Sequence, residues 1–334
     1  MDTNRINEIL SVAEAAAFAA GEWTGKGQKN LADSAATEAM RSRLNSLDIS
    51  GRIVIGEGER DEAPMLFIGE EVGRGGEQID IAVDPLEGTN LCASAQPNSL
   101  AVIAFAPRGA LLYAPDTYME KIAAGPAARD AIDIDATPQQ NVKNVAEALG
   151  KPVDELVVCV LDREKHNDLI AAIRQVGARV RLITDGDVFG CVASAIEGTG
   201  IDMYMGAGGA PEGVLAATAM KSVGGGFMGR FAFRSDEERK RAEKTSGVDI
   251  DGVLKMDDLV RSDEAVFIAA GVTDGELLKG VRGRAHLDST GQLVVSEPGR
   301  SARVSSIIMN CKDRTVRFNE TIYRGESGGM LSLS

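Results

Sequence analysis

Between residues 156 and 223 the chain alternates three times between a short apolar segment and a helical pattern, and this alternation constrains the fold more than any other feature. Strands are expected at residues 156–161, 180–184 and 201–205, and helices at 166–176, 188–196 and 211–223. Strands that alternate with helices in this way predict βαβ units and a parallel sheet. A further strand at residues 264–270 is expected to join the same sheet.

The first part of the chain has a different character. Helices are predicted over residues 3–20 and 31–47, and strands at 52–55, 79–83 and 99–106. The last fifty residues are also β-rich. We therefore predict an α/β (α+β) protein with a mixed N-terminal sheet and a mainly parallel C-terminal sheet. The expected subdomains are residues 1–138 and 139–334, with the site in the cleft between them.

The formal net charge of −14 limits the partners of this chain. Nucleic-acid binding needs a positive field, so it is not expected. An acidic protein that handles an anionic substrate must build a local positive site, from metal ions and a few Lys or Arg side chains. No apolar run approaches membrane-spanning length, and the first residues lack the regions of a signal peptide. No membrane association is expected.

The cysteines are widely spaced along the chain. No pair has C-x-x-C spacing, and the chain has two histidines, so a structural zinc site has little support. Wide spacing is typical of reduced, mostly buried thiols, and we expect a cytoplasmic protein. The cysteines are Cys92, Cys159, Cys191 and Cys311.

Carboxylates follow two of the predicted strands. Glu57 and Glu59 come after the first strand, and Asp84 and Glu87 come after the second. Unpaired acids at the ends of two core strands would repel each other and lose hydration. A hard divalent cation removes this conflict, because Mg²⁺ and Mn²⁺ take oxygen ligands. The sequence therefore predicts a metal site suited to phosphate chemistry.

The strongest motif is Asp-Pro-Leu-Glu-Gly-Thr at residues 84–89. Pro85 fixes φ and forces a sharp exit from the strand, and Gly88 lets the backbone approach a ligand closely. The two acids of the motif can contact neighbouring metals, and Thr89 supplies a hydroxyl beside them. Alone, the motif would be better explained as a turn with solvated acids. The nearby Glu57 favours the metal site.

Two more motifs lie where predicted parallel strands end. Residues 208–212, Gly-Gly-Ala-Pro-Glu, open a helix, and exposed amides at a helix start suit an anion. Residues 185–187, Asp-Gly-Asp, end the preceding strand, at the edge where ligands of parallel sheets usually bind. The plainer interpretations are a helix start with a dipole-stabilised Glu212 and an N-cap with a tight turn.

Positive charge for a substrate can come from two segments. Lys121 lies close to Tyr118, and Arg163 and Lys165 follow the strand at residues 156–161. A solvated turn is the plain alternative for the second segment. His166 has no partner visible in the sequence and is expected to cap a helix or face solvent.

Together these motifs resemble a known family. Residues 84–89 are similar to the D-P-[IL]-[DE]-G-T signature of the lithium-sensitive, metal-dependent sugar and inositol phosphatases. The ordered blocks at residues 55–66, 84–89, 118–121, 185–187 and 208–214 resemble class II fructose-1,6-bisphosphatases. The resemblance implies a layered α-β-α-β-α sugar-phosphatase fold and hydrolysis of the 1-phosphate of fructose-1,6-bisphosphate. It also implies possible activity on sedoheptulose-1,7-bisphosphate, as in photosynthetic bacteria.

The resemblance assigns roles to individual residues. Mg²⁺ or Mn²⁺ would be held by Asp33, Glu57, Asp84, Glu87 and Glu212. The catalytic residues would be Asp33, Glu57 and Thr89, of which Thr89 would position the attacking water with help from an acid. The substrate would be bound by Lys29, Glu87, Gly88, Thr89, Tyr118, Lys121, Arg163, Glu164, Lys165, Asp185, Gly186, Asp187 and Gly209. Glu59 would lie behind the direct ligands, and the family implies a homodimer or homotetramer.

Two other functions remain open at this point. An inositol-monophosphatase-like enzyme would take a substrate with one phosphate, which leaves the second basic segment without a ligand. A catalytically silent regulator that binds a metal or a sugar phosphate would have no need of the Thr89 hydroxyl. A nucleotide-dependent enzyme is not expected, because the sequence has no G-x-x-x-x-G-K-[ST] motif.

Overall fold

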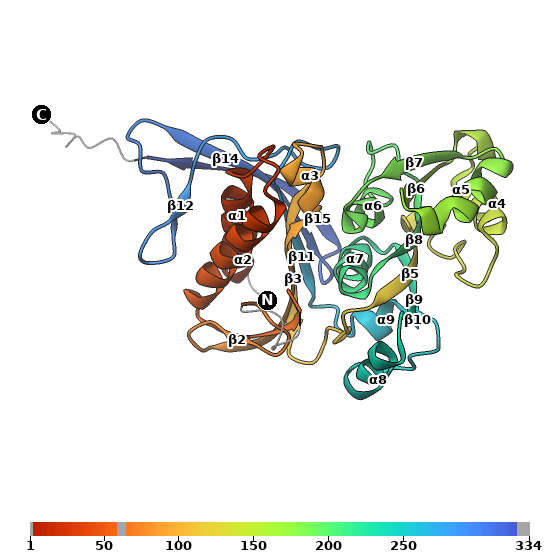
Figure 1. The fold of residues 1–334 in the computed structure, drawn as a ribbon, viewed down its shortest axis with the longest axis horizontal. Helices are drawn as coiled ribbons and strands as arrows, with labels where there is room; N and C mark the ends of the chain where they lie inside the picture. Colours follow the sequence, from red (N-terminus) through yellow and green to blue (C-terminus); the bar gives the residue numbers. More distant parts are fainter. Residues whose placement is uncertain (1–2, 59–64, 326–334) are drawn as a thin grey trace, which may run out of the picture.

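The computed structural model describes residues 3–58 and 65–325 as a stack of alternating helical and sheet layers. Figure 1 shows the order of the layers: α1 and α2, a seven-stranded sheet, α6 and α7, a six-stranded sheet, and finally α4 and α5. The expected α-β-α-β-α arrangement is confirmed. Each sheet has helices on both of its faces, so that both faces can be apolar.

The elements have the following bounds. The helices are α1 (Thr3–Gly21), α2 (Lys29–Asn45), α3 (Thr89–Ala93), α4 (Pro138–Leu149), α5 (Asn167–Gln175), α6 (Asp187–Ala193), α7 (Ala210–Val223), α8 (Asp236–Thr245) and α9 (Met256–Leu259). Short 3₁₀ turns are η1 (Pro126–Ala128), η2 (Val153–Glu155) and η3 (Glu164–His166). The strands are β1 (Ile49–Ile55), β2 (Glu71–Val72), β3 (Glu77–Glu87), β4 (Leu100–Pro107), β5 (Tyr118–Ala124), β6 (Val157–Leu161), β7 (Arg179–Ile183), β8 (Met203–Gly209), β9 (Gly226–Ala232), β10 (Leu254–Lys255), β11 (Val266–Gly271), β12 (His286–Leu287), β13 (Leu293–Val294), β14 (Ser301–Asn310) and β15 (Thr315–Arg324).

The seven-stranded sheet draws on both ends of the chain. Its order is β15-β14-β11-β4-β3-β1-β2, and only β1 and β3 run parallel among its paired strands in the described part of the chain. β11 pairs antiparallel with β4 and β14, so the expectation that this strand joins the parallel C-terminal sheet is wrong. The reason is that β11 is buried along its whole length and finds its neighbours among strands from both halves of the chain.

The six-stranded sheet has the order β10-β9-β5-β8-β6-β7. β6 pairs in parallel with β7 and with β8, as the strand–helix alternation predicts. β5, however, lies antiparallel between β8 and β9, and β10 is antiparallel to β9. The sheet is therefore mixed rather than mainly parallel, because an early strand is inserted into it. Strands thus cross the expected boundary at residue 138 in both directions, and the two subdomain ranges stay a prediction.

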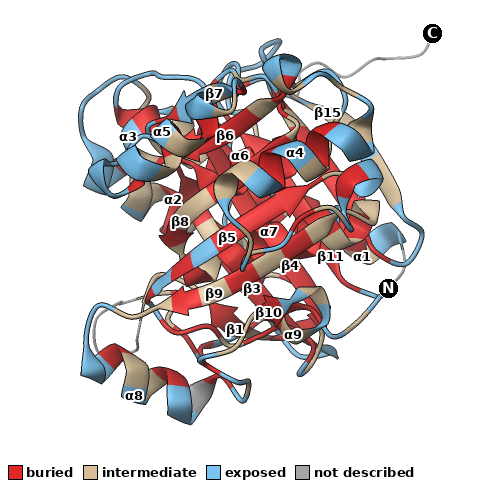
Figure 2. Ribbon diagram, turned by 90° about the vertical axis from the view of Figure 1, so that its right-hand side faces the viewer, coloured by how far each residue is buried: buried red, intermediate tan, exposed pale blue. Residues whose placement is uncertain are grey.

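Alternating side chains on the central strands form separate apolar cores. On β4, Val102 packs in the core around α6 and α7, whereas Ile103 and Phe105 pack beneath α1 and α2. A third core lies between the six-stranded sheet and the outer helices α4 and α5. Figure 2 shows buried residues along the central strands and exposed residues on α4 and α8. The buried central strands thus hold residues that line the site.

The structure also tests the expectations of buried thiols and of no membrane-spanning helix. All four cysteines are buried and free of disulfides, which confirms the expected buried thiols. Within residues 3–58 and 65–325, no helix combines the length and the apolar character that a membrane crossing requires.

Candidate active site

A bulge at the end of β3 brings Asp84 and Glu87 to the same face of the sheet. Residues three apart on a regular strand point to opposite faces. Here Asp84 pairs with Val102 and Glu87 with Leu100, so β3 uses three residues where β4 uses two. The extra residue belongs to the Pro85–Leu86 step, and proline has no N–H to give to a ladder. Both carboxylates therefore face α7.

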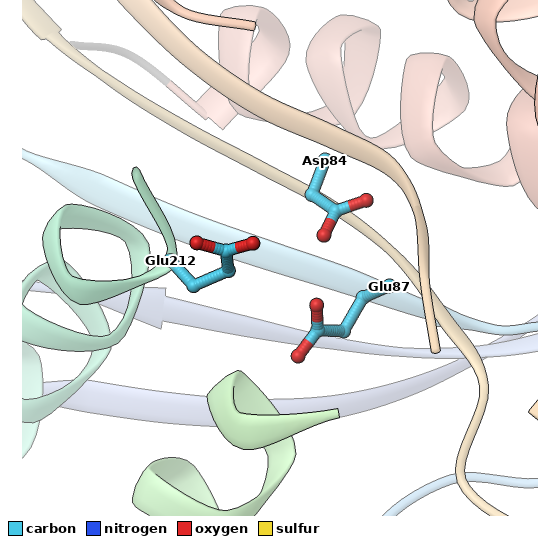
Figure 3. Close-up of side chains that lie close together, drawn as sticks. All are labelled: Asp84, Glu87 and Glu212. Carbon is cyan, nitrogen blue, oxygen red and sulfur yellow. The ribbon is translucent and has the colours of Figure 1, made fainter. Parts of the chain in front are cut away.

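α7 adds a third carboxylate to this pair. Ligand oxygens of Asp84, Glu87 and Glu212 all lie within 4.8 Å of one another. Figure 3 shows the three carboxylates directed toward a common space, with Glu212 coming from the first turn of α7. Three acids this close repel one another unless a cation or protons balance them. This is the one group of potential metal ligands found among the described residues.

The pKa values of these acids reflect that conflict. Desolvation and the charge of Asp33 raise the pKa of Asp84 to about 6, although hydrogen bonds to its carboxylate act in the opposite direction. Desolvation and the charge of Asp84 raise the pKa of Glu87 well above its usual value. Desolvation and the charge of Asp187 raise the pKa of Glu212 to about 7. The cluster is therefore poised to exchange protons for a cation.

The donor atoms of the cluster fit a divalent metal. Glu212 Oε2 is buried and has no hydrogen-bond partner among the described residues, which is costly for a carboxylate oxygen. Glu87 Oε1 accepts a hydrogen bond of 2.9 Å from the Val188 amide at the start of α6, which fixes that side chain. An all-oxygen donor set with one unsatisfied buried oxygen is what Mg²⁺ or Mn²⁺ would complete.

Two glycines allow acidic side chains to lie close to the backbone at the end of β8. A Cβ on Gly209 would lie 1.9 Å from Glu212 Oε2, and one on Gly208 would lie 1.8 Å from Asp187 Oδ2. The pair of glycines therefore lets the carboxylates pack directly against the backbone of β8. The Gly-Gly sequence of the motif thus leaves room for these carboxylates beside the backbone.

Asp33 and Glu57 lie outside the group of three but within electrostatic range of it. Desolvation and the charges of Asp33, Asp84 and Glu212 raise the pKa of Glu57 to about 8. Desolvation alone raises the pKa of Asp33, which lies in the first turns of α2. The structure thus brings all five expected metal ligands into one electrostatic cluster. Glu59 lies outside the described residues, as does the rest of the 59–64 stretch within the block at residues 55–66.

The turn after Glu87 orders the predicted catalytic hydroxyl. Gly88 has a φ of 77°, a left-handed conformation that side chains disfavour, and it leads into α3. The Thr89 hydroxyl donates to the Leu86 carbonyl at 3.2 Å. Lys29, at the start of α2, is exposed and makes no hydrogen bond or ion pair with other described residues. Its role in substrate binding stays a prediction.

A cleft of about 800 Å³ extends from the acids along the edge of the six-stranded sheet. Most of the predicted substrate residues line it, whereas Gly88, Thr89, Glu164 and Lys29 are not part of its wall. The predicted residues in the wall are Glu87, Tyr118, Lys121, Arg163, Lys165, Asp185, Gly186, Asp187, Gly209 and Glu212. The cleft runs between the ends of β5, β6 and β8, where the strand ends were expected to meet.

Lys121 and Asp187 form a buried ion pair inside this wall. Lys121 Nζ lies 2.5 Å from Asp187 Oδ2 and donates to the Gly209 carbonyl at 2.8 Å. Their side chains are 1% and 6% exposed, respectively. Desolvation opposes the charge on Lys121, but Asp187 and Glu212 raise its pKa overall. The ammonium group is therefore engaged within the protein, between the two sequence motifs, and its role in substrate binding stays a prediction.

Replacing Lys121 with methionine is expected to destabilise the protein by about 3–5 kcal/mol, because Asp187 would be left as an unpaired buried charge. The free energy of unfolding, measured with urea, checks this. The double variant Lys121→Met/Asp187→Asn should recover part of the loss. A double variant no more stable than Lys121→Met would show that the lysine acts through packing rather than through its charge.

Asp185, Arg163, Lys165 and His166 form another part of the wall of the cleft. Asp185 Oδ2 accepts a hydrogen bond of 3.0 Å from Asn90 Nδ2, and its Oδ1 lies 3.8 Å from Arg163 Nη2. Asn90, which the sequence analysis did not single out, thus links the two halves across the cleft. Its position directly after Thr89 was the sequence feature that could have marked it as a site residue.

His166 is buried, so the expectation that it faces solvent is wrong; it occupies the N-cap position of α5, but its side chain makes no capping hydrogen bond. The Ala207 amide donates to His166 Nε2 at 2.9 Å, so the proton is on Nδ1, which donates to the Leu161 carbonyl at 2.8 Å. Burial lowers the pKa of this histidine. The neutral ring therefore joins the end of β6 to β8. Both partners are backbone groups, which a sequence pattern does not reveal.

A basic cluster surrounds Tyr118 at the mouth of the cleft. Lys165 Nζ lies 3.8 Å from the centre of the Tyr118 ring, and the guanidinium carbon of Arg234 lies 4.9 Å from it. Arg234 follows β9, a strand that the sequence analysis did not predict. The alternation of Phe227, Gly229 and Phe231 was the signal for that strand.

Comparison with known proteins identifies the family. The sequence profile of the family described as bacterial fructose-1,6-bisphosphatase, glpX-encoded, matches residues 3–323. The chain belongs to this family. It is 43% identical to the D-fructose 1,6-bisphosphatase class 2/sedoheptulose 1,7-bisphosphatase of Prochlorococcus marinus (strain NATL1A), over the full length of both chains.

Other relatives support the same conclusion. The protein of that name from Thermosynechococcus vestitus (strain NIES-2133 / IAM M-273 / BP-1) is 45% identical, over 95% of this chain and 94% of the relative. Among solved structures, an extragenic suppressor from Pyrococcus furiosus is 12% identical, with a TM-score of 0.31, over 57% of this chain and 70% of that one. That similarity is too low to support a conclusion, whereas membership of the bisphosphatase family makes the chain a phosphatase of this class.

Proposed function

We propose that this chain hydrolyses the 1-phosphate of fructose-1,6-bisphosphate to fructose-6-phosphate and inorganic phosphate. Sedoheptulose-1,7-bisphosphate is proposed as a second substrate, because the relatives described above carry both activities in their names. The observation that carries the proposal is the group of Asp84, Glu87 and Glu212 at one end of a cleft whose other end is basic. A bisphosphate needs a site with these two ends.

Asp84, Glu87 and Glu212 would hold divalent metal, and Asp33 and Glu57 would complete its surroundings. When bound, Mg²⁺ or Mn²⁺ would neutralise the phosphate charge and act as a Lewis acid on the phosphoryl group. The buried, unpartnered oxygen of Glu212 supports this assignment. The donor set accepts either ion, so the choice between them is left to the assay below.

The residues of the chain would perform the remaining steps. The Thr89 hydroxyl would orient the attacking water, and Asp33 or Glu57 would accept its proton. Glu57 suits this task because its carboxylate lies within electrostatic range of Asp33, Asp84 and Glu212. Glu87, Gly88, Asp185 and Gly209 would position the sugar close to the acids. Hydrolysis would proceed by positioning and electrostatics, without a covalent enzyme intermediate.

The basic end would hold the distal phosphate. Tyr118, Lys121, Arg163 and Lys165 line it, and Lys29 and Glu164, which lie outside the wall, are proposed as further substrate contacts. Lysine at position 165 offers a point charge rather than a forked guanidinium. We also propose, from the motif at residues 84–89, that the chain is related to the lithium-sensitive phosphatases. By analogy with the family, we propose that it forms a homodimer or homotetramer. A cytoplasmic location is proposed because it would suit four free thiols.

Phosphate release from fructose-1,6-bisphosphate, sedoheptulose-1,7-bisphosphate and inositol-1-phosphate tests this function. The assay should be run with Mg²⁺, with Mn²⁺ and with EDTA. We expect metal-dependent release from the sugar bisphosphates and little from inositol-1-phosphate, which has no second phosphate for the basic end. Release that is equal in EDTA, or fastest from inositol-1-phosphate, would contradict the proposal.

A further inference from the structure

Asn90 lies next to the proposed catalytic hydroxyl but has no role in the function described above. It follows Thr89 in α3 and donates a hydrogen bond to Asp185, a residue of the cleft wall. We propose that Asn90 is a positioning residue, which holds one oxygen of Asp185 so that the other oxygen is available to a hydroxyl of the sugar. This inference rests on the proposed bisphosphatase function and adds to it a residue that acts through Asp185.

Both donors of Asn90 meet the same oxygen of the Asp185 carboxylate. Asn90 Nδ2 lies 3.0 Å from Asp185 Oδ2, and the Asn90 amide nitrogen lies 3.4 Å from it. Within residues 3–58 and 65–325, Asp185 Oδ1 accepts no hydrogen bond, and Arg163 Nη2 approaches it to 3.8 Å. A long and exposed ion pair of this kind orients a carboxylate only weakly. The orientation of Asp185 therefore depends mainly on Asn90.

The oxygen that Asn90 leaves free is the one that a ligand can reach. The Asp185 side chain is 24% exposed and forms part of the cleft wall. A carboxylate oxygen without a donor is a strong acceptor for a hydroxyl group. Asp185 thus has one oxygen engaged with the protein and one available to the sugar.

The same contact fixes Asp185 relative to the proposed metal ligands. A Cβ on Gly186 would lie 3.9 Å from Glu87 Oε1, and this oxygen accepts a hydrogen bond of 2.9 Å from the Val188 amide. The turn at residues 185–188 is therefore held by Glu87 and, through Asp185, by Asn90. Since a displacement of about 1 Å at a substrate-positioning group can lower a rate about 100-fold, this double attachment matters for the reaction.

A neutral donor suits this position. The charge of Asp185 is among those that raise the pKa of Asp84, so Asp185 lies within electrostatic range of the acidic cluster. A lysine or arginine in place of Asn90 would neutralise Asp185 and compete with the sugar hydroxyl for it. The amide of Asn90 orients the carboxylate and leaves its charge in place.

The plain alternative is that Asn90 only joins α3 to the turn before α6. Its loss would then lower the free energy of unfolding and leave KM unchanged. The two roles can be separated, because positioning acts through the Asp185 carboxylate and a structural contact does not.

The first test is the KM for fructose-1,6-bisphosphate at saturating metal, measured for Asn90→Ala, Asp185→Asn and the variant that carries both. We expect Asn90→Ala to raise KM about tenfold, the scale for losing a charge-assisted hydrogen bond. The change in kcat should be smaller, because Asp185 would contact a part of the substrate that does not react. Added to Asp185→Asn, the same change should alter KM by less than about twofold, since the two residues act as a unit.

Gln140→Ala is the matched control. Gln140 Nε2 donates to Asn144 Oδ1 at 2.7 Å on α4, so it also makes a hydrogen bond between two exposed side chains. Neither residue belongs to the wall of the cleft. KM for Gln140→Ala should therefore stay at the wild-type value.

The exchanged pair Asn90→Asp/Asp185→Asn is the second test. It keeps an amide and a carboxylate in contact but moves the charge from the cleft wall to α3. We expect its free energy of unfolding to match that of the wild type, while its KM is raised about tenfold. The metal concentration that gives half of the maximal rate should be unchanged, because neither residue is a proposed metal ligand.

The outcomes separate this inference from the proposed function. A wild-type enzyme that releases phosphate from neither sugar bisphosphate would overturn the function itself. With an active wild type, an unchanged KM in Asn90→Ala would overturn the positioning role, as would an equal rise in KM when Asp185 is already asparagine. A normal KM for the exchanged pair, or a shifted metal requirement, would show that Asn90 acts on the structure of the site rather than through Asp185.

Discussion

Asp84→Asn is expected to lower metal-dependent phosphate release by at least about 100-fold and, at the same time, to stabilise the metal-free protein. The loss follows because an amide oxygen is a far weaker ligand than a carboxylate. Even mutation of a residue that only supports a metal ligand lowers metal affinity or activity about 10–100-fold. The gain follows because asparagine removes one charge from three mutually repelling acids. Asparagine can still accept the hydrogen bond that Asp84 Oδ1 takes from the Leu86 amide.

Steady-state rates with Mn²⁺ and urea unfolding in EDTA check both parts of this prediction. We expect the free energy of unfolding in EDTA to rise by about 1 kcal/mol at pH 8, where Asp84 is ionised. Asp80→Asn is the matched control on the same strand. Asp80 is buried but paired, with Arg52 Nη2 at 3.0 Å and the Gly109 amide at 2.6 Å. Its replacement should therefore destabilise the protein and leave the metal dependence intact.

A normal rate of phosphate release for Asp84→Asn would show that Asp84 is not a metal ligand. If Asp84→Asn instead loses stability in EDTA, the acids are not in conflict in the metal-free protein. The two readouts move in opposite directions only when the carboxylate is placed for a cation rather than for the fold. This contrast distinguishes a functional acid from a structural one.

The second large effect is the dependence of stability on pH. In EDTA the free energy of unfolding is expected to fall by several kcal/mol as the pH rises from about 4.5 to about 8. The pKa values of Asp84, Glu212 and Glu57 are raised to about 6, 7 and 8. An acid with a raised pKa binds more protons in the folded state than in the unfolded one. Stability is therefore greatest at low pH and declines until each group has ionised.

Bound metal should reverse this trend, since protons compete with a cation for the same oxygens. The thermal midpoint with Mn²⁺ minus the midpoint in EDTA is expected to grow steadily between pH 6 and pH 8.5. Asp84→Asn should flatten that growth, whereas Asp80→Asn should preserve it. A difference that is constant with pH, or an EDTA midpoint that rises between pH 6 and pH 8, would contradict the prediction.

Local sequence patterns were sufficient to predict much of the fold and of the carboxylate cluster. The strand–helix alternation correctly predicted the parallel strands β6, β7 and β8, because each βαβ unit is specified by adjacent residues. Acids that directly follow apolar strands correctly indicated a carboxylate cluster, since strand ends meet at one edge of a sheet. The motif at residues 84–89 and its companions were enough to place the chain in its family.

Such local patterns did not predict which distant strands pair or which charged side chains are buried. β5 enters the six-stranded sheet and β11 leaves it because strands choose partners by the fit of whole faces, which involves residues far apart in sequence. A local motif also does not tell how deeply a charge will be buried. Lys121 is predicted as a substrate contact, and its motif gives no sign that it also forms a buried ion pair with Asp187 and a hydrogen bond to the Gly209 carbonyl.

The family, the layered fold class and the acids of the cluster could all be predicted from residue types at short spacing in the sequence. That Asp84 and Glu87 share a face could not be predicted, because it depends on a bulge defined by pairing with β4. The tertiary structure alone brought Arg234 to Tyr118 and buried His166 between β6 and β8. Desolvation and contact between distant segments arise only once the chain has folded.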